Sequence, residues 1–242
     1  MRNLLLTLVL VPSLLAQEQR TPVGGGEAAG LVQVEVEWIE LPHEHFTELI
    51  AEGGAKRGEE FRARVGKLMR ENLAKSLEVQ IVTGASGEKL SSGSCKELIF
   101  PTEYQQRVMI DPPPPMEIPV PELRDDYHRI FAPTAFETRE IGSLLEIEPM
   151  VSRDSNHIQM VIEPQLTWHT GNTVWLEHKN GAGNVSKIQM PEIYSLKFHT
   201  ALRLKPGSCI LAAALSPKDA EGTADMSRKV LVFVKADLVS PP

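Results

Sequence analysis

Valine and tryptophan alternate with glutamine and glutamate between residues 32 and 38. This period of two predicts a β-strand with one buried face. The segment from Val230 to Leu238 is apolar on both faces instead, which is typical of a strand in the centre of a sheet. We predict strands at both places.

A spacing of three and four residues predicts a helix that begins near Glu59. Polar residues such as Arg62 and Lys67 face away from its apolar stripe. The stripe consists of Phe61, Val65, Leu68, Met69, Leu73 and Leu77. We expect this amphipathic helix to pack on a sheet, and we predict a shorter helix from Pro42 to Ile50.

Turn residues divide the rest of the chain into short apolar segments. Two strands, 78–83 and 90–100, flank the turn at Ser86 and Gly87. The two predicted antiparallel hairpins are 138–149 with 157–164, and 194–204 with 209–215 around Pro206-Gly207. The predicted fold class is α+β, mainly antiparallel β-sheet hairpins with one amphipathic helix packed on a face. We expect the stretches around Ile141, Ile158, Ile210 and Val232 to share one sheet.

The chain begins with the features of an export signal. Arg2 precedes an apolar run, Leu4 to Leu15, which is shorter than the roughly 20 residues that span a bilayer. We predict a signal peptide over 1–16 and a flexible linker over 17–30. The predicted domain covers 31–240 and includes a proline-rich surface loop over 105–133, because four consecutive prolines cannot continue a central strand.

Composition and charge narrow the function classes. With 242 residues and 42% hydrophobic residues, the chain can bury one core. The net charge is -7 and the basic residues are scattered, so we expect no nucleic-acid partner. In an oxidising compartment Cys95 and Cys209 could form a disulfide, or each could pack as a small apolar residue. The sequence leaves both states open.

Candidate chemistry is sparse. His43 and His45 are the weak candidates for metal ligands, but zinc sites take three or four protein ligands and no third one lies near in sequence. A Gly-x-Ser-x-Gly elbow is absent, and the glycines at 24–26 are not followed by the Lys-Ser or Lys-Thr of a phosphate loop. We therefore predict no catalytic residues, no cofactor and no enzyme activity. A metal-dependent hydrolase is the remote alternative.

Several motifs, in their order along the chain, resemble the core of the secretins, the outer-membrane pore-forming subunits of type II and type III secretion and type IV pilus machines. They are most similar to Verrucomicrobia-type secretin-like proteins. The motifs are Val32–Glu40 (VQVEVEWIE), Phe100–Tyr104 (FPTEY), Phe136–Pro149, Pro206–Leu211 and Leu231–Ala236. The resemblance implies structural roles for Arg139, Gly142, Pro149 and Gly207.

The resemblance implies an exported, non-enzymatic protein of the periplasm or outer membrane. Its partners would be proteins, through self-association or a secretion or pilus machine, with an association with the outer membrane. Three departures leave a monomeric periplasmic adaptor or binding module as the alternative. Ala213-Ala214 replaces a Gly-Gly pair, residues 216–227 are short and charged where the family carries its lip and gate, and the ring-forming modules that precede a secretin core are expected to be missing.

Overall fold

The computed structural model describes residues 30–53, 58–109, 128–179, 185–219 and 221–239. The predicted signal peptide and nearly all of the predicted linker lie outside these residues. So does the centre of the proline-rich loop.

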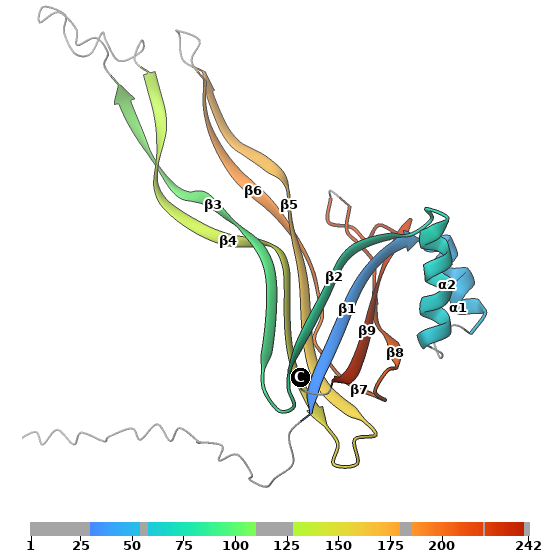
Figure 1. Cartoon of the computed structure of the whole chain (residues 1–242). Coiled ribbons are helices and arrows are strands. Elements are labelled where there is room, and N and C mark those ends of the chain that lie inside the picture. Colours follow the sequence, from blue (N-terminus) through green and yellow to red (C-terminus); the bar gives the residue numbers. More distant parts are fainter. Residues whose placement is uncertain (1–29, 54–57, 110–127, 180–184, 220, 240–242) are drawn as a thin grey trace, which may run out of the picture.

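The described residues form nine strands and two helices (Figure 1). They are β1 (Leu31–Pro42), α1 (His43–Ala51), α2 (Gly58–Arg70), β2 (Lys75–Ala85), β3 (Leu90–Met109), β4 (His128–Val151), β5 (Ile158–Lys179), β6 (Val185–Lys197), β7 (Thr200–Leu204), β8 (Cys209–Leu215) and β9 (Arg228–Val239).

The strands form two antiparallel sheets. The small sheet has the order β2-β1-β9-β8, and the large sheet has the order β3-β4-β5-β6. The short strand β7 pairs with β5 on the edge that β6 also occupies, so β6 and β7 follow one another along β5. Figure 1 shows the small sheet facing the lower half of the large sheet, with α1 and α2 beyond the small sheet.

The main core lies between the two sheets. Alternate residues of β1 from Val32 to Trp38 are fully buried there, as the period of two predicts. They meet Leu145 of β4 and Ile162 of β5 from the large sheet. The buried indole of Trp38 lies 6.1 Å from the ring of Phe198, measured between centroids.

A second core covers the other face of the small sheet. Phe61 and Val65 of α2 belong to one buried cluster with Ile39, Leu231 and Phe233. Because even-numbered residues of β9 face the large sheet and odd-numbered ones face this cluster, β9 is buried on both sides, between β1 and β8. The predicted central strand at the end of the chain is confirmed.

The long helix ends earlier than its apolar spacing predicts. Asn72 adopts a left-handed conformation with φ 59°, the N–H of Leu73 donates to the Leu68 carbonyl, and that of Asn72 donates to the Met69 carbonyl. These two bonds form a Schellman cap, which satisfies the last carbonyls of α2 and turns the chain out of the helix. Leu77, expected on the helical stripe, lies in β2 instead.

The expectation of a single sheet is wrong. The stretches around Ile141 and Ile158 lie in the large sheet, whereas those around Ile210 and Val232 lie in the small one. The predicted second hairpin is also wrong, because β7 pairs with β5 and β8 pairs with β9. Gly207, with φ 80°, makes the turn that carries the chain from one sheet to the other, and its N–H donates to the Ala236 carbonyl.

The strands of the large sheet are much longer than predicted. Residues 128–151 form one strand where 138–149 was expected, and β3 continues to Met109. The predicted surface loop is therefore wrong at both of its ends. Pro133 lies opposite Tyr104, in a part of β4 that pairs with β3 alone. Proline lacks the backbone N–H, and on this open side of β4 there is no further strand that would need that donor. In Figure 1 the β3-β4 and β5-β6 hairpins extend as two arms well beyond the small sheet.

An ion pair between Arg62 and Glu37 joins α2 to the small sheet. Arg62 donates from Nε and Nη2 to the two carboxylate oxygens of Glu37, at 2.5 and 2.7 Å, and only 25% and 15% of these side chains are exposed. We expect Arg62→Met to lower the free energy of unfolding by about 1.5–3 kcal/mol, because it leaves a largely buried carboxylate unpaired. Arg64→Met removes an exposed pair with Glu52 and should cost less than about 0.5 kcal/mol. Equal losses in urea titrations of the two variants would contradict this.

Candidate functional site

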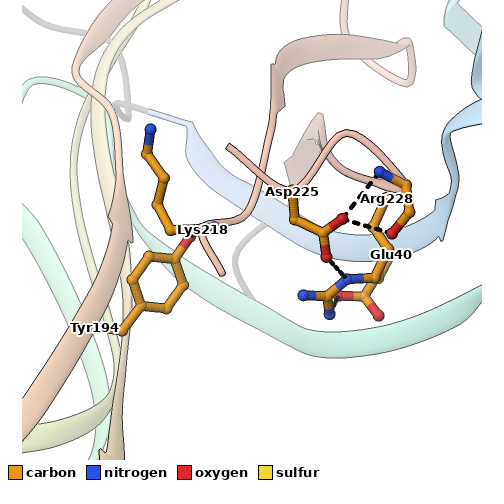
Figure 2. A network of polar contacts seen from close by, with 6 residues as sticks. Glu40, Tyr194, Lys218, Asp225 and Arg228 are labelled. Carbon is orange, nitrogen blue, oxygen red and sulfur yellow. Dashed lines mark hydrogen bonds and ion pairs between the residues drawn. The ribbon is translucent and has the colours of Figure 1, made fainter. Parts of the chain in front are cut away.

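A cleft of about 430 Å³ opens where the two sheets diverge, at the end of the main core. One side comes from β5 and β6 of the large sheet. The other side comes from β1, β2 and β9 of the small sheet and from the loop that joins β8 to β9. Figure 2 shows part of its lining, with Tyr194 on one side and Arg228 on the other. The cleft is thus built from segments far apart in sequence.

The wall of the cleft is aromatic and its floor is aliphatic. The rings of Trp168 and Tyr194 stack, with centroids 5.7 Å apart and planes inclined by 16°. Both side chains continue the inward-facing rows that begin with Leu166 and Leu196, but beyond the point where the small sheet covers them. The half-buried aromatic surface therefore faces the cleft.

The guanidinium group of Arg228 helps to attach the β8-β9 loop to the small sheet. Arg228 donates from Nε to Asp225 at 2.7 Å and from Nη1 to Glu40 of β1 at 3.0 Å. Asp225 also accepts from the N–H and the hydroxyl of Ser227, at 2.9 and 2.5 Å (Figure 2). The charge of Arg228 is compensated within the chain, and the loop is fixed at the edge of the cleft.

The same loop reaches the large sheet through Tyr194. The backbone N–H of Lys218 donates to the Tyr194 hydroxyl oxygen at 3.2 Å, and Figure 2 shows this hydroxyl next to Lys218. Burial raises the pKa of Tyr194, so the phenol keeps its proton at neutral pH. No acceptor for that proton is found among the described residues. The Tyr194 hydroxyl oxygen thus accepts one hydrogen bond, while its O–H group can still donate one to a ligand or to water.

Asp225 gives the loop a pH dependence. Hydrogen bonds from Ser227 and then Arg228 lower the pKa of Asp225 to about 2, against about 3.9 in an unfolded chain. Since the folded-state pKa is the lower one, the carboxylate stabilises the fold above about pH 4, and this contribution is lost as the pH falls from about 4 to 2. We expect Asp225→Asn to flatten the fall in melting temperature over this range.

The comparison of Asp225→Asn with wild type isolates this group. Hydrogen bonds from Ser152 and Asn156 also lower the pKa of Asp154. Asp154 is present in both proteins, so its contribution to the change in melting temperature is the same and drops out of the difference. Identical changes in melting temperature between pH 4 and pH 2 for the two proteins would contradict the assignment.

The two candidate metal ligands do not converge. His43 begins α1, where its Nδ1 is buried with no hydrogen-bond partner among the described residues and its ring lies beside Phe46. Nδ1 of His45 lies 3.3 Å from a carboxylate oxygen of Glu48, one turn further along the helix. Within the described ranges, no group of three or more histidine, cysteine, aspartate or glutamate side chains is placed to hold a metal ion.

Both cysteines are free thiols in the structure. Cys95 lies on β3 of the large sheet, where its Sγ contacts the Ser143 carbonyl at 3.3 Å. Cys209 lies on β8 and packs against the cluster beneath the helices, so the small sheet stands between the two thiols. Burial raises the pKa of the Cys209 thiol to about 11. The disulfide that the sequence left open is not formed here.

The four residues that the family pattern singles out lie at separate places. Arg139 is exposed on the β4 arm, 3.6 Å from Glu137, and Gly207 makes the turn between the sheets. Gly142 pairs with Cys95 where β4 leaves β5. Pro149 is buried near the end of β4, and its carbonyl accepts from Gly87 of the β2-β3 turn. None of the four lines the cleft.

The cleft residues were not predicted from the sequence. Glu40, Trp168, Tyr194 and Arg228 come from four strands, and no local spacing connects them. The only sequence signal was indirect: the loop from Ser216 to Ser227 is short and charged where the family has an apolar segment. That loop supplies Lys218 and Asp225.

Comparisons with known proteins found similar chains among solved structures alone. No protein-family model and no curated protein matches the sequence. Among solved structures, the InvG secretin-domain β-barrel of the Salmonella SPI-1 injectisome is 8% identical, with a TM-score of 0.40, over 88% of this chain and 64% of that chain. The type II secretin GspD of enteropathogenic Escherichia coli is 11% identical, with a TM-score of 0.41, over 88% and 70%.

Aeromonas hydrophila ExeD is 9% identical, with a TM-score of 0.44, over 88% of this chain and 49% of that chain. This chain thus spans about two thirds or less of the length of InvG and ExeD. Neither α1 nor α2, the helices in the described part of the chain, is long and apolar enough to cross a membrane. These three secretin structures are thus similar to this chain at TM-scores of 0.40 to 0.44.

Proposed function

We propose that this chain is an exported, non-enzymatic envelope protein whose copies join side by side in a secretion or pilus complex. The observation that carries the proposal is the pair of terminal strands of the large sheet. Along the path β3-β4-β5-β6, β3 and β6 each have one ladder neighbour, which leaves a row of backbone donors and acceptors open on either side.

The number of strands makes these edges complementary. Successive strands of the path are antiparallel, so β3 and β6 run in opposite directions. When β6 of one copy pairs with β3 of the next, the antiparallel alternation therefore continues without a break. A ring of such copies would satisfy the open edges by closing the sheet on itself.

The arms carry the apolar surface that fits the predicted association with the outer membrane. Trp175 is 72% exposed and projects from a β-bulge of β5, between Val174 and Leu176. Further exposed apolar side chains on the arms are Ile99, Phe136, Val185 and Ile193. Large exposed apolar side chains on extended hairpins favour cover by lipid or by a neighbouring subunit over contact with water.

One observation favours the alternative, a monomeric adaptor. Within a single chain the two arms already touch, since Tyr104 donates its hydroxyl proton to the Gln189 carbonyl at 3.4 Å, and the Phe131 N–H donates to the Ser186 hydroxyl at 3.0 Å. These contacts shelter part of β6 without a second copy. The oligomeric state distinguishes the two functions.

A proline on the open edge of β3 tests the assembly. The Ser94 carbonyl faces β4, because a Cβ at Gly142 would lie 2.1 Å from it. Backbone groups alternate in direction along a strand, so the N–H of Glu97 faces the open edge. We expect the wild type to form large assemblies in light scattering. Glu97→Pro should shift the protein towards the monomer, because proline removes the donor.

Glu97→Ala is the matched control, since it removes the carboxylate but keeps the N–H. It should assemble like wild type, and circular dichroism checks that both variants are folded. A wild-type protein that stays monomeric, or a folded Glu97→Pro variant that assembles normally, would reject side-by-side pairing through β3.

A further inference from the structure

We propose that the cleft between the sheets binds a monocarboxylate carried on an apolar group, such as a fatty acid or the C-terminal residue of a peptide with an apolar side chain. The proposal is independent of assembly. It rests on the donors, the charge and the apolar lining that the cleft brings together.

Two hydrogen-bond donors at the cleft have no acceptor among the described residues. The Tyr194 hydroxyl accepts from the Lys218 N–H, and its own proton is left over. Lys75, at the start of β2, is an exposed side chain on the lining of the cleft, and its ammonium has no ion-pair partner within the described part of the chain. A carboxylate has two oxygens that accept such bonds and carries no proton of its own at neutral pH.

The charges around the cleft leave room for one negative group. Lys75, Lys218 and Arg228 supply three positive charges, and Glu40 and Asp225 supply two negative ones. Arg228 is already held between the two carboxylates, so the unpaired charges belong to the lysines. In a chain of net charge -7, this excess of one positive charge is complementary to a single carboxylate.

Most of the remaining lining suits an apolar group beside that carboxylate. Leu77, Leu196 and Val230 form an aliphatic floor, and the stacked pair of Trp168 and Tyr194 forms one wall. The exposed side chains of His169 and Thr170 add polar groups on the side of the large sheet. A volume of about 430 Å³ lies within the roughly 300–1,000 Å³ of small-molecule sites, which are typically apolar with a few placed polar groups. The polar groups lie at the rim, so the acid would face outward and the apolar group inward.

Calorimetric titration of the purified chain with decanoate and with a short peptide ending in leucine tests the proposal. At least one of them should bind saturably with one site per chain. Decanol, or the same peptide with an amidated C-terminus, should bind at least about tenfold more weakly, because the acid is missing. If decanoate alone binds, the source is a fatty acid, and if the peptide alone binds, it is a polypeptide C-terminus.

Tyr194→Phe and Lys75→Met remove one donor each and should each weaken binding by about tenfold. Lys96→Met, on the exposed edge of β3, is the matched control and should bind like wild type. In a Trp175→Phe background Trp168 and the fully buried Trp38 remain as emitters. A change in emission on binding that disappears when Trp168 is also replaced by Phe would place the ligand against the aromatic wall. The absence of saturable binding of either acid, equal binding of the uncharged analogues, or unchanged affinity in both donor variants would overturn the proposal.

Discussion

We expect Gly142→Ala to lower the free energy of unfolding by about 2–5 kcal/mol, the combined cost of backbone strain and overpacking. Gly142 has φ 139°, a conformation that side-chain-bearing residues rarely adopt. A Cβ there would lie 2.1 Å from the Ser94 carbonyl oxygen and 2.9 Å from Cα of Cys95, both in the backbone of β3. Backbone atoms in a ladder cannot move aside cheaply, so β3 and β4 would separate at the point where β4 leaves β5.

Gly171→Ala is the matched control for this substitution. Gly171 also lies in a long strand of the large sheet, but no atom lies within 4 Å of its added Cβ. Gly171→Ala should lower the free energy of unfolding by less than about 0.5 kcal/mol. Urea titrations give both values, and a Gly142→Ala variant as stable as Gly171→Ala would show that β3 and β4 do not approach each other in this way.

The second large effect concerns the core between the sheets. Trp38 is fully buried from β1 and packs across the core near Phe198. Trp38→Ala should lower the free energy of unfolding by about 3–5 kcal/mol. It removes the largest fully buried side chain of the described residues and leaves a cavity between two sheets that cannot collapse freely. Trp175→Ala removes the same side chain from an exposed site on an arm and should cost less than about 0.5 kcal/mol. Similar costs for the two tryptophans would contradict the two-sheet core.

Local sequence patterns predicted where the strands lie better than they predicted which strands pair with one another. The alternation in β1 and the double-sided apolar run in β9 were sufficient because both strands are buried in a regular way. The turns before β3 and after β7 were recognised as turns. A turn sequence does not state whether the next strand pairs with the previous one, and at both of these turns the chain changes sheet.

The arms escaped prediction for a different reason. Along β5 beyond Thr167, bulges near Thr170 and Trp175 interrupt the period of two, and the side chains there are mostly exposed. The sequence of this segment therefore shows no regular alternation of apolar and polar residues, and it does not predict a strand. The cleft was equally hidden, because Glu40 and Tyr194 meet only through the packing of two sheets.

Lysine cross-linking between isotopically distinct copies tests side-by-side assembly most directly. Lys96 lies on β3, and Lys187 and Lys197 lie on β6, so pairing of these two strands brings lysines of neighbouring copies together. In a mixture of ordinary and ¹⁵N-labelled protein, we expect cross-links that join Lys96 of one isotopic form to Lys187 or Lys197 of the other. If every cross-link between β3 and β6 joins residues of the same isotopic form, the two edges do not pair between copies and the proposed assembly is wrong.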